Sequence, residues 1–301
     1  MKTKHRRALV DPYLIDEGSR FRLNDVDPDD TSDLYADQDS AKAALREGID
    51  RLRALQEKLY AQDQWGALLI FQAMDAAGKD GAIEHVMSGV NPQGCEVYAF
   101  KQPSAEELDH DFLWRTLRRL PERGRIGIFN RSYYEEVLVV RVHPEILANQ
   151  KLPRSAKGKN VFAGRYEDIN AHERYLTRNG YVIRKFFLHI SKKEQTRRFQ
   201  DRVNDPDKQW KFSLGDLREQ ERWRDYMTAY ETAIRRTATK HAPWVVIPAN
   251  RKWFARLVVV AAIIDALEEL DLEFPKLTSD KRKELEEGQK ILRRKVSSGS
   301  T

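Results

Sequence analysis

Residues 67–81, ALLIFQAMDAAGKDG, decide the fold of this chain. The stretch begins with a short apolar run at 68–71, which is typical of a buried parallel strand. Small residues then lead to Gly78 and Lys79, and the segment IEHVMSGV that follows indicates a helix that begins at the lysine. A glycine turn before a helix directs backbone N–H groups and the helix N-terminus at one spot, and this spot favours phosphate.

The match to a general phosphate-binding loop is incomplete. The pattern G-x-x-x-x-G-K-[ST] expects a glycine where Ala73 stands and a hydroxyl residue where Asp80 stands, so only Gly78 and Lys79 fit. A turn into a helix that happens to carry a lysine is the competing interpretation. The motif alone does not decide between the two.

The composition leaves several classes of partner open. Lys and Arg number 53 against 47 Asp and Glu, which gives a formal net charge of +6 on 301 residues. This basic excess favours polyanionic partners, but nucleic acid, a phosphorylated substrate and plain solubility all fit it. The chain is long enough to bury a substantial core and fits one large domain.

The cysteine count and the absence of long apolar segments indicate the cellular compartment. Cys95 is the only cysteine, which excludes an internal disulfide and a cysteine-based zinc site and fits a reducing compartment. The basic N-terminus has no apolar signal core, and no apolar run approaches the ~20 residues of a membrane span. We therefore expect a cytoplasmic protein with no membrane partner.

Five short apolar segments alternate with helical patterns. The segments are residues 68–71, 95–100, 125–129, 181–190 and 244–247. This alternation predicts a three-layer α/β fold, in which helices flank a five-stranded parallel sheet with right-handed crossovers. Ligands of such sheets bind beyond the carboxyl ends of the strands. One rim should therefore gather the 73–81 loop, Lys101, Asn130, Arg131 and the segment that begins at 191.

Helical patterns lie between and around these strands. An amphipathic pattern covers 39–62, and Ser104 with Glu107 forms a capping box before a helix that should run to Pro121. Further helices are predicted at 166–178, 214–239 and 252–272.

The chain divides into three parts. Residues 1–38 carry two Asp-Pro pairs and an acidic segment, which indicates an N-terminal arm over the body. Residues 39–275 form the body, with a basic segment at about 191–215 that begins as a helix and breaks at an Asp-Pro pair. Residues 276–301 form a charged C-terminal tail. Three tryptophans are interpreted as residues of core or interface packing rather than as base-stacking platforms: Trp210, Trp223 and Trp244.

The residues of the rim suit phosphoryl transfer, which needs positioned cations, a metal and an oriented acceptor. Lys79 can neutralise the transferring group, Asp75 and Asp80 lie within loop reach of a magnesium ion, and Arg131 can fork two phosphate oxygens. Four more cations belong to the 191–215 segment: Arg198 and Arg202 at i and i+4, then Lys208 and Lys211.

Each basic residue also has an ordinary interpretation. Arg198 and Arg202 could pair with Glu194 or Asp201 on a solvated helix. Such interpretations do not predict that the cations meet at one rim.

Five motifs together resemble the second polyphosphate kinase family. They are MDAAGKDG (74–81), NPQG (91–94), FKQP (100–103), FNRSYYE (129–135) and DPDKQWK (205–211). Their order and spacing across residues 67–250 are much more specific than any one of them. The family's loop has the form Asp-x-x-Gly-Lys, so the departures from the general phosphate-loop pattern are expected within it.

The resemblance implies a P-loop kinase fold like that of thymidylate kinase, with a helical lid over the site. It also implies a magnesium-dependent exchange of phosphoryl groups between inorganic polyphosphate and nucleotides, with Mn²⁺ as a substitute, and we expect a homo-oligomer. Asp75 resembles the family's loop carboxylate for metal or acceptor, and Lys79 its phosphate lysine. Arg131 resembles the arginine of the second motif. The other implied residues are the lid cations Arg198, Arg202, Lys208 and Lys211, the phosphate-binding Ala76, Ala77, Gly78, Asp80, Gly81 and Lys101, and Glu135 as a metal ligand with Asp75.

One departure concerns the acceptor. Many members have Asp-Arg where this chain has Asn130-Arg131, and an amide can neither ionise nor supply charge to a metal. The subgroup with asparagine resembles enzymes that phosphorylate nucleoside monophosphates as well as diphosphates. The sequence thus predicts transfer from polyphosphate to AMP and ADP.

Two alternatives stay open. One is an ATP-dependent nucleoside or nucleotide kinase of the same architecture. The other is a basic nucleic-acid-binding protein, against which the basic residues are mixed with acids and no aromatic RNA-binding pattern is present.

Overall fold

The centre of the molecule is a six-stranded sheet with the strand order β1-β6-β5-β2-β4-β3. The computed structural model describes residues 3–35 and 38–298. The strands are β1 (Leu14–Ile15), β2 (Gly66–Ala73), β3 (Cys95–Ala99), β4 (Ile126–Asn130), β5 (Tyr181–His189) and β6 (Trp244–Pro248). β2 to β6 pair in parallel, and β1 pairs with β6 in the antiparallel direction. The α/β class and all five predicted strands are confirmed.

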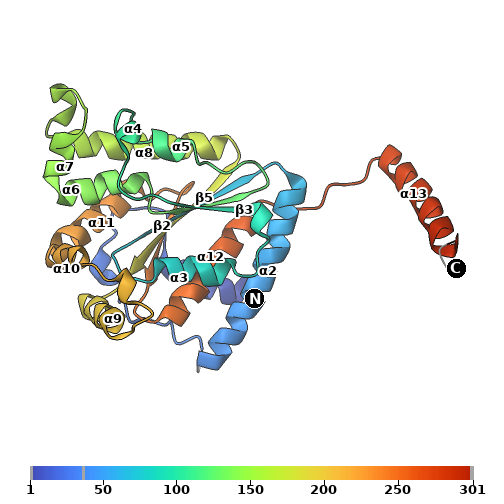
Figure 1. Cartoon of the computed structure of the whole chain (residues 1–301), viewed down its shortest axis with the longest axis horizontal. Helices are drawn as coiled ribbons and strands as arrows, with labels where there is room; N and C mark the ends of the chain where they lie inside the picture. Colours follow the sequence, from blue (N-terminus) through green and yellow to red (C-terminus); the bar gives the residue numbers. More distant parts are fainter. Residues whose placement is uncertain (1–2, 36–37, 299–301) are drawn as a thin grey trace.

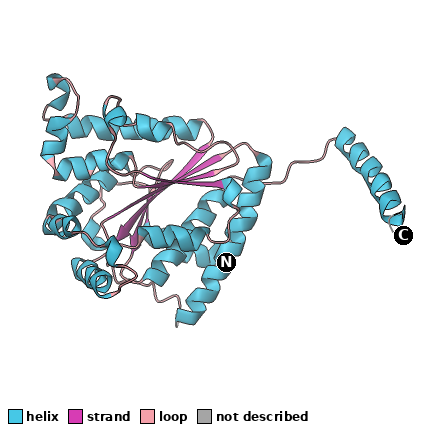
Figure 2. Cartoon of the chain, viewed as in Figure 1, coloured by secondary structure: helices cyan, strands magenta, loops and turns pink. Residues whose placement is uncertain are grey.

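Helices cover both faces of this sheet (Figure 1, Figure 2). One face carries α2 (Gln38–Gln62), α3 (Lys79–Met87) and α12 (Lys252–Glu268), and the other carries α8 (Val161–Arg178) and α11 (Trp223–Thr237). The remaining α-helices are α1 (Thr3–Val10), α4 (Ala105–Leu108), α5 (Trp114–Leu117), α6 (Val139–Val142), α7 (Pro144–Asn149), α9 (Lys192–Asn204), α10 (Leu214–Glu221) and α13 (Ser279–Ser298). Single 3-10 turns are η1 (Asp11–Tyr13), η2 (Leu23–Asp25), η3 (Pro92–Gly94), η4 (Tyr133–Val137), η5 (Arg154–Lys157) and η6 (Gln209–Lys211). No helix in the described ranges has the length and apolar character needed to cross a membrane.

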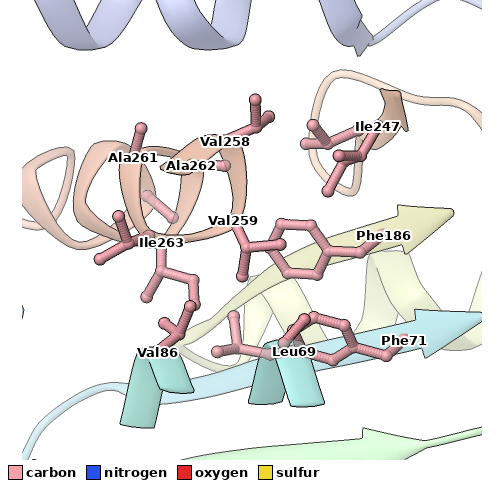
Figure 3. Packing of buried hydrophobic residues seen from close by; sticks show 14 of the residues in the cluster. Leu69, Phe71, Val86, Phe186, Ile247, Val258, Val259, Ala261, Ala262 and Ile263 are labelled. Carbon is pink, nitrogen blue, oxygen red and sulfur yellow. The ribbon is translucent and has the colours of Figure 1, made fainter. Parts of the chain in front are cut away.

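The central strands are apolar on both sides because both faces are covered. All eight residues of β2 are buried, and successive residues contribute to opposite cores. Leu69 and Phe71 join the core under α12, where Phe71 stacks on Phe186 with ring centroids 4.6 Å apart. Figure 3 shows Val259 of α12 against this pair. The apolar residues 68–71 therefore anchor β2 in the core, and the phosphate loop follows directly after this strand.

Two predicted helices are broken. The helix expected from Ser104 to Pro121 keeps its capping box, but it ends after α4 and restarts as α5. Asp111 explains the break, because its side chain accepts a hydrogen bond from the backbone N–H of Leu113 at 3.0 Å and so competes with helical bonding. The helix expected over 214–239 is divided at Arg222 into α10 and α11.

The N-terminal arm is tied into the body. Leu9 and Tyr13 are buried, and Arg6 of α1 forms ion pairs with Asp265 at 3.1 Å and Glu268 at 2.6 Å on α12. β1 follows as the edge strand. The sequence did not predict this strand because two residues are too few for a periodic pattern.

Candidate active site

The phosphate-binding loop joins β2 to α3. Gly78 is the N-cap of α3 and has φ +96°, a conformation that L side chains rarely adopt, and a Cβ there would lie 3.4 Å from Nη1 of Arg198. Ala76 also has positive φ, at +61°, which is uncommon for a residue with a side chain. The loop therefore keeps a strained path that aims the first turn of α3, beginning at Lys79, at a cavity.

Lys79 is half-buried and has no hydrogen bond or ion pair with another residue of the described ranges. Burial lowers the pKa of its ammonium group, and the charge of Arg131 acts in the same direction. Glu135, Asp75 and Asp80 oppose this shift. A cation that faces a cavity without a protein partner is available to an anionic ligand.

The second motif begins at the end of β4. Because β4 pairs with β2 in parallel, Asn130 lies opposite Phe71, and the N–H of Arg131 donates to the carbonyl of Phe71 at 3.0 Å. Arg131 has φ +64°. Its Nη2 donates to Oδ1 of Asp75 at 2.7 Å, and its Nη1 lies 3.6 Å from Oε2 of Glu135.

Charges at this pair are mutually stabilised. Burial works against the charge of Arg131, but Glu135 and Asp75 outweigh it and raise the pKa of the guanidinium. The neighbouring amide of Asn130 donates to Oδ1 of Asp80 at 2.6 Å. Two contacts therefore join the second motif to the phosphate loop. One is the ion pair of Arg131 with Asp75, and the other is the hydrogen bond from Asn130 to Asp80.

A buried ion pair supports the turn that carries Glu135. The phenols of Tyr133 and Tyr134 both donate to Oε1 of Glu173 at 2.9 Å. Nζ of Lys185 donates to Oε2 of the same carboxylate at 2.6 Å, and the side chains of this pair have 0% exposure. The second motif therefore rests on a charge pair that solvent does not reach.

Arg198 of α9 is buried and connects this helix to the phosphate loop. Its Nη1 donates to the carbonyls of Ala76 and Ala77 at 3.0 and 2.7 Å. Its Nη2 donates to those of Ala249 and Asn250 at 2.6 and 3.1 Å. Its Nε donates to Glu194 at 2.7 Å, so the predicted pairing with Glu194 is present and every guanidinium N–H direction has a protein acceptor.

The other three predicted cations of the 191–215 segment are more exposed than Arg198. Arg202 pairs with Asp216 at 3.3 Å rather than with Glu194 or Asp201, and Lys208 pairs with Asp205. Nζ of Lys211 lies 4.9 Å from the ring centroid of Trp210. Trp210 is 77% exposed and so lies outside the core of this chain, whereas Trp244 is buried as predicted and Trp223 packs against both cores.

Two large cavities open at this rim. The first, here called the cationic cavity, has about 360 Å³ and is lined by loop residues 74–82 together with Leu188, Arg198, Asp201, Arg202, Lys208, Lys211, Lys252, Ala255 and Arg256. The second, the apolar-walled cavity, has about 550 Å³ and is lined by residues that include Phe100, Lys101, Pro103, Phe112, Arg115, Arg131, Glu135 and His143. A third cavity of about 120 Å³ shares Asp75 with the first and shares Arg131 and Glu135 with the second.

The chain matches the model of a known protein family over most of its length. A family model described as Polyphosphate kinase 2 (PPK2) matches residues 35–275, which include every residue lining the three cavities. The chain belongs to the polyphosphate kinase 2 family.

Relatives of this polyphosphate kinase are similar over nearly their full length. An ADP-polyphosphate phosphotransferase of Rhodopseudomonas palustris is 50% identical over 91% of this chain and 94% of its own. An AMP/ADP-polyphosphate phosphotransferase of Meiothermus ruber is 44% identical over 87% of this chain and 94% of its own. The crystal structure of polyphosphate kinase 2 from Arthrobacter aurescens superposes with a TM-score of 0.82 at 42% identity, covering 91% of this chain and 95% of that chain. The chain is a polyphosphate-dependent nucleotide phosphotransferase.

Two further cations of the site were not among the residues predicted from the sequence. Lys252 and Arg256 lie one turn apart at the start of α12 and line the cationic cavity, and neither has an ion pair within the described ranges. Lys252 follows β6, so the rule that the carboxyl ends of parallel strands form the site could have found it. Lys101 is predicted from the sequence to bind phosphate. In the structure it lines the apolar-walled cavity and not the cationic cavity.

The donor set fits a magnesium ion shared with substrate. Within residues 3–35 and 38–298, no group of three or more His, Cys, Asp or Glu could hold a metal by itself. Mg²⁺ does not require such a cage, because it binds through one or two carboxylates together with phosphate oxygens and water. Asp75, Glu135 and Glu219 line the third cavity, of about 120 Å³, and supply oxygen ligands of this kind. Glu219 on α10 carried no signal in the sequence that set it apart from its charged neighbours.

Proposed function

We propose that this protein transfers the terminal phosphoryl group of inorganic polyphosphate to AMP and to ADP, giving ADP and ATP. The ion pair of Asp75 with Arg131 carries the proposal, because it stands between a cavity rich in cations and a cavity with aromatic and aliphatic walls. A polyanionic donor and a nucleotide acceptor would meet at such a boundary.

The cationic cavity suits the donor. Lys79, Lys252 and Arg256 face it without ion-pair partners among the described residues, and Arg202, Lys208 and Lys211 add charge from the lid. A chain of phosphates presents one negative charge after another, so several separated cations bind it better than one deep pocket.

The apolar-walled cavity suits the acceptor. Its volume lies in the range of small-molecule sites, and Phe100 and Phe112 offer surface for a base. Lys101 and Arg131 line the same cavity and can hold the acceptor's phosphates. This placement gives Lys101 a role on the nucleotide side.

The phosphoryl group passes directly from polyphosphate to the nucleotide, without a phosphoenzyme intermediate. A terminal phosphate oxygen of AMP or ADP attacks the terminal phosphorus of polyphosphate in line, and the bond from that phosphorus to the bridging oxygen breaks. The shortened polyphosphate leaves with the bridging oxygen and its electron pair. Lys79 and Arg131 hold the charge of the transferring group on either side, and Asp75 orients Arg131. Asp75 and Glu135 would hold Mg²⁺, which would supply charge neutralisation for the phosphates.

Use of AMP in addition to ADP rests on Asn130. Its amide donates to Asp80 beside Lys79, where an aspartate would place a second negative charge against the first. Because the amide is neutral, an acceptor phosphate at this point meets no additional negative charge. Both acceptor patterns occur in the names of relatives, since one is an ADP-polyphosphate and another an AMP/ADP-polyphosphate phosphotransferase.

The decisive experiment incubates the protein with magnesium, long-chain polyphosphate and either AMP or ADP, and follows ADP and ATP. Products from both acceptors are expected. Product from ADP alone would remove AMP from the proposal. Transfer from ATP but not from polyphosphate would identify an ATP-dependent kinase, and salt-sensitive nucleic-acid binding without transfer would identify a nucleic-acid-binding protein.

A further inference from the structure

Gln72 is a buried amide in β2, a strand whose other residues are small or apolar. Its exposure is 0%, and it lies on the side of β2 from which Leu68 and Ile70 enter the core beneath α8 and α11. Its Oε1 is buried and has no hydrogen-bond partner among the described residues. A polar atom buried in this way costs free energy of folding, so core packing does not explain a glutamine at this position.

The nitrogen of the same amide contacts the second motif. Nε2 of Gln72 donates to Oε1 of Glu135 at 3.0 Å. This contact fixes the orientation of the amide, because an ionised carboxylate accepts hydrogen bonds and does not donate them. The unpartnered oxygen of Gln72 is therefore a consequence of presenting a donor to Glu135.

This hydrogen bond divides the two oxygens of Glu135 between different neighbours. Oε1 accepts from Gln72, while Oε2 lies 3.6 Å from Nη1 of Arg131. Without the amide, both oxygens would be free to turn to the guanidinium and form a two-bond fork with it. Such a fork would withdraw Glu135 from the third cavity, which it lines together with Asp75.

We propose that Gln72 is a positioning residue for the transfer, which holds the carboxylate of Glu135 at the third cavity and so keeps it in place to bind a divalent cation. This inference rests on the proposed function, in which Asp75 and Glu135 hold Mg²⁺. Gln72 lines none of the three cavities, so it acts through Glu135. Hydrogen-bond partners of metal-binding carboxylates commonly have this role.

Replacement of Gln72 by methionine tests this role, because methionine has a similar length and cannot donate a hydrogen bond. The affinity for Mn²⁺ in the presence of ADP, measured by electron paramagnetic resonance without polyphosphate, should fall by about tenfold or more in Q72M. The midpoint of denaturant unfolding should stay the same or rise, because the variant also removes the unpartnered oxygen. A lower midpoint with unchanged affinity for Mn²⁺ would show a merely structural glutamine and overturn the proposal.

Gln56 supplies the matched control. It lies on α2, is 1% exposed, and its Oε1 is also buried without a hydrogen-bond partner among the described residues. It lines none of the three cavities. Q56M should therefore keep the wild-type affinity for Mn²⁺. An equal loss of affinity in Q56M and Q72M would show a general effect of replacing a buried glutamine, and the proposal would fall.

The E135Q background tests whether Gln72 acts through Glu135, whatever Q72M does to stability. E135Q alone should lower the affinity for Mn²⁺, and addition of Q72M should lower it by less than about twofold more, because residues that act as a unit are not additive. An unchanged affinity in E135Q, or a full tenfold further loss on addition of Q72M, would contradict the proposal. These binding measurements contain no polyphosphate, so they can fail while transfer to AMP and ADP by the wild type is intact.

Discussion

Nη2 of Arg131 donates a hydrogen bond of 2.7 Å to Oδ1 of Asp75, although 56 residues separate the two in the chain. The parallel pairing of β2 with β4 explains the approach, because Phe71 lies opposite Asn130 and both motifs start where these strands end. The strand next to β2 therefore places Arg131 beside the phosphate loop, where it pairs with Asp75.

Substitution of Arg131 should remove transition-state charge stabilisation. For R131A we expect kcat for ADP with polyphosphate to fall by about 10²–10³, the usual effect of losing one preorganised donor. R131K keeps a positive charge but loses the fork that reaches both Asp75 and Glu135, so it should recover only part of the rate. Steady-state kinetics at saturating magnesium measure both. Wild-type kcat in R131A would place the chemistry elsewhere.

Asn130 should govern the choice between AMP and ADP. In N130D a carboxylate would face Asp80 at the position where the amide now donates at 2.6 Å. The added charge should lower the ratio of kcat/KM for AMP to that for ADP by about tenfold or more, which corresponds to ~1.4 kcal/mol. N130S is the neutral control and should keep the ratio near the wild-type value. An unchanged ratio in N130D would separate acceptor choice from this residue.

Arg198 and Arg202 share a helix face but should behave differently. Arg198 holds four loop carbonyls and Glu194, so R198A should lower the free energy of unfolding by about 3–5 kcal/mol, the usual cost of breaking a buried charged network. Arg202 is more exposed and pairs with Asp216, so R202A should change stability by less than about 1 kcal/mol. R202A should instead raise KM for polyphosphate. Denaturant unfolding and donor titration separate these outcomes, and equal effects of both variants would contradict the distinction.

The sequence was sufficient to predict the five parallel strands and the approach of the two motifs. Residues 68–71 are apolar and residues 181–190 are mostly apolar because both faces of the sheet are covered, and this burial is visible in the composition of the strands. Parallel strands with a common carboxyl edge then bring residues 75–81 and 130–131 together by geometry.

The directions in which charged side chains point could not be predicted from the sequence. Arg198 and Arg202 have the same residue type and the same helix, and only the positions of Ala76 and Ala249 show that one arginine meets carbonyls. The break in the helix around Asp111 depends on one competing hydrogen bond, which periodicity does not register. Charged residues therefore have to be assigned from the folded chain.

The buried pair of Lys185 and Glu173 should be costly to break but tolerant of joint replacement. Burial lowers the pKa of Lys185, and Glu173 opposes that shift. K185M leaves the carboxylate buried without its counter-charge, so we expect a loss of about 3–5 kcal/mol in the free energy of unfolding. K185M/E173Q removes both charges and keeps an acceptor for Tyr133 and Tyr134, so it should lose less than K185M alone. A larger loss in the double variant would contradict the charge argument.

Stability should depend on pH through His143, which contacts carboxylates on α7 and α10. Nε2 of His143 lies 2.8 Å from Glu219 on α10, and Nδ1 lies 3.0 Å from Glu145. Burial works against protonation, but the hydrogen bonds with both carboxylates outweigh it and raise the pKa of His143. A raised pKa means that the contribution to stability is complete below the ordinary value of about 6.5 and is lost as the pH rises through the value in the folded protein. The difference in the free energy of unfolding between the wild type and H143Q should therefore be larger at about pH 6 than at about pH 8.5. Repeating the comparison in an E219Q background should shrink this pH dependence, and a difference that grows with pH would contradict the assignment.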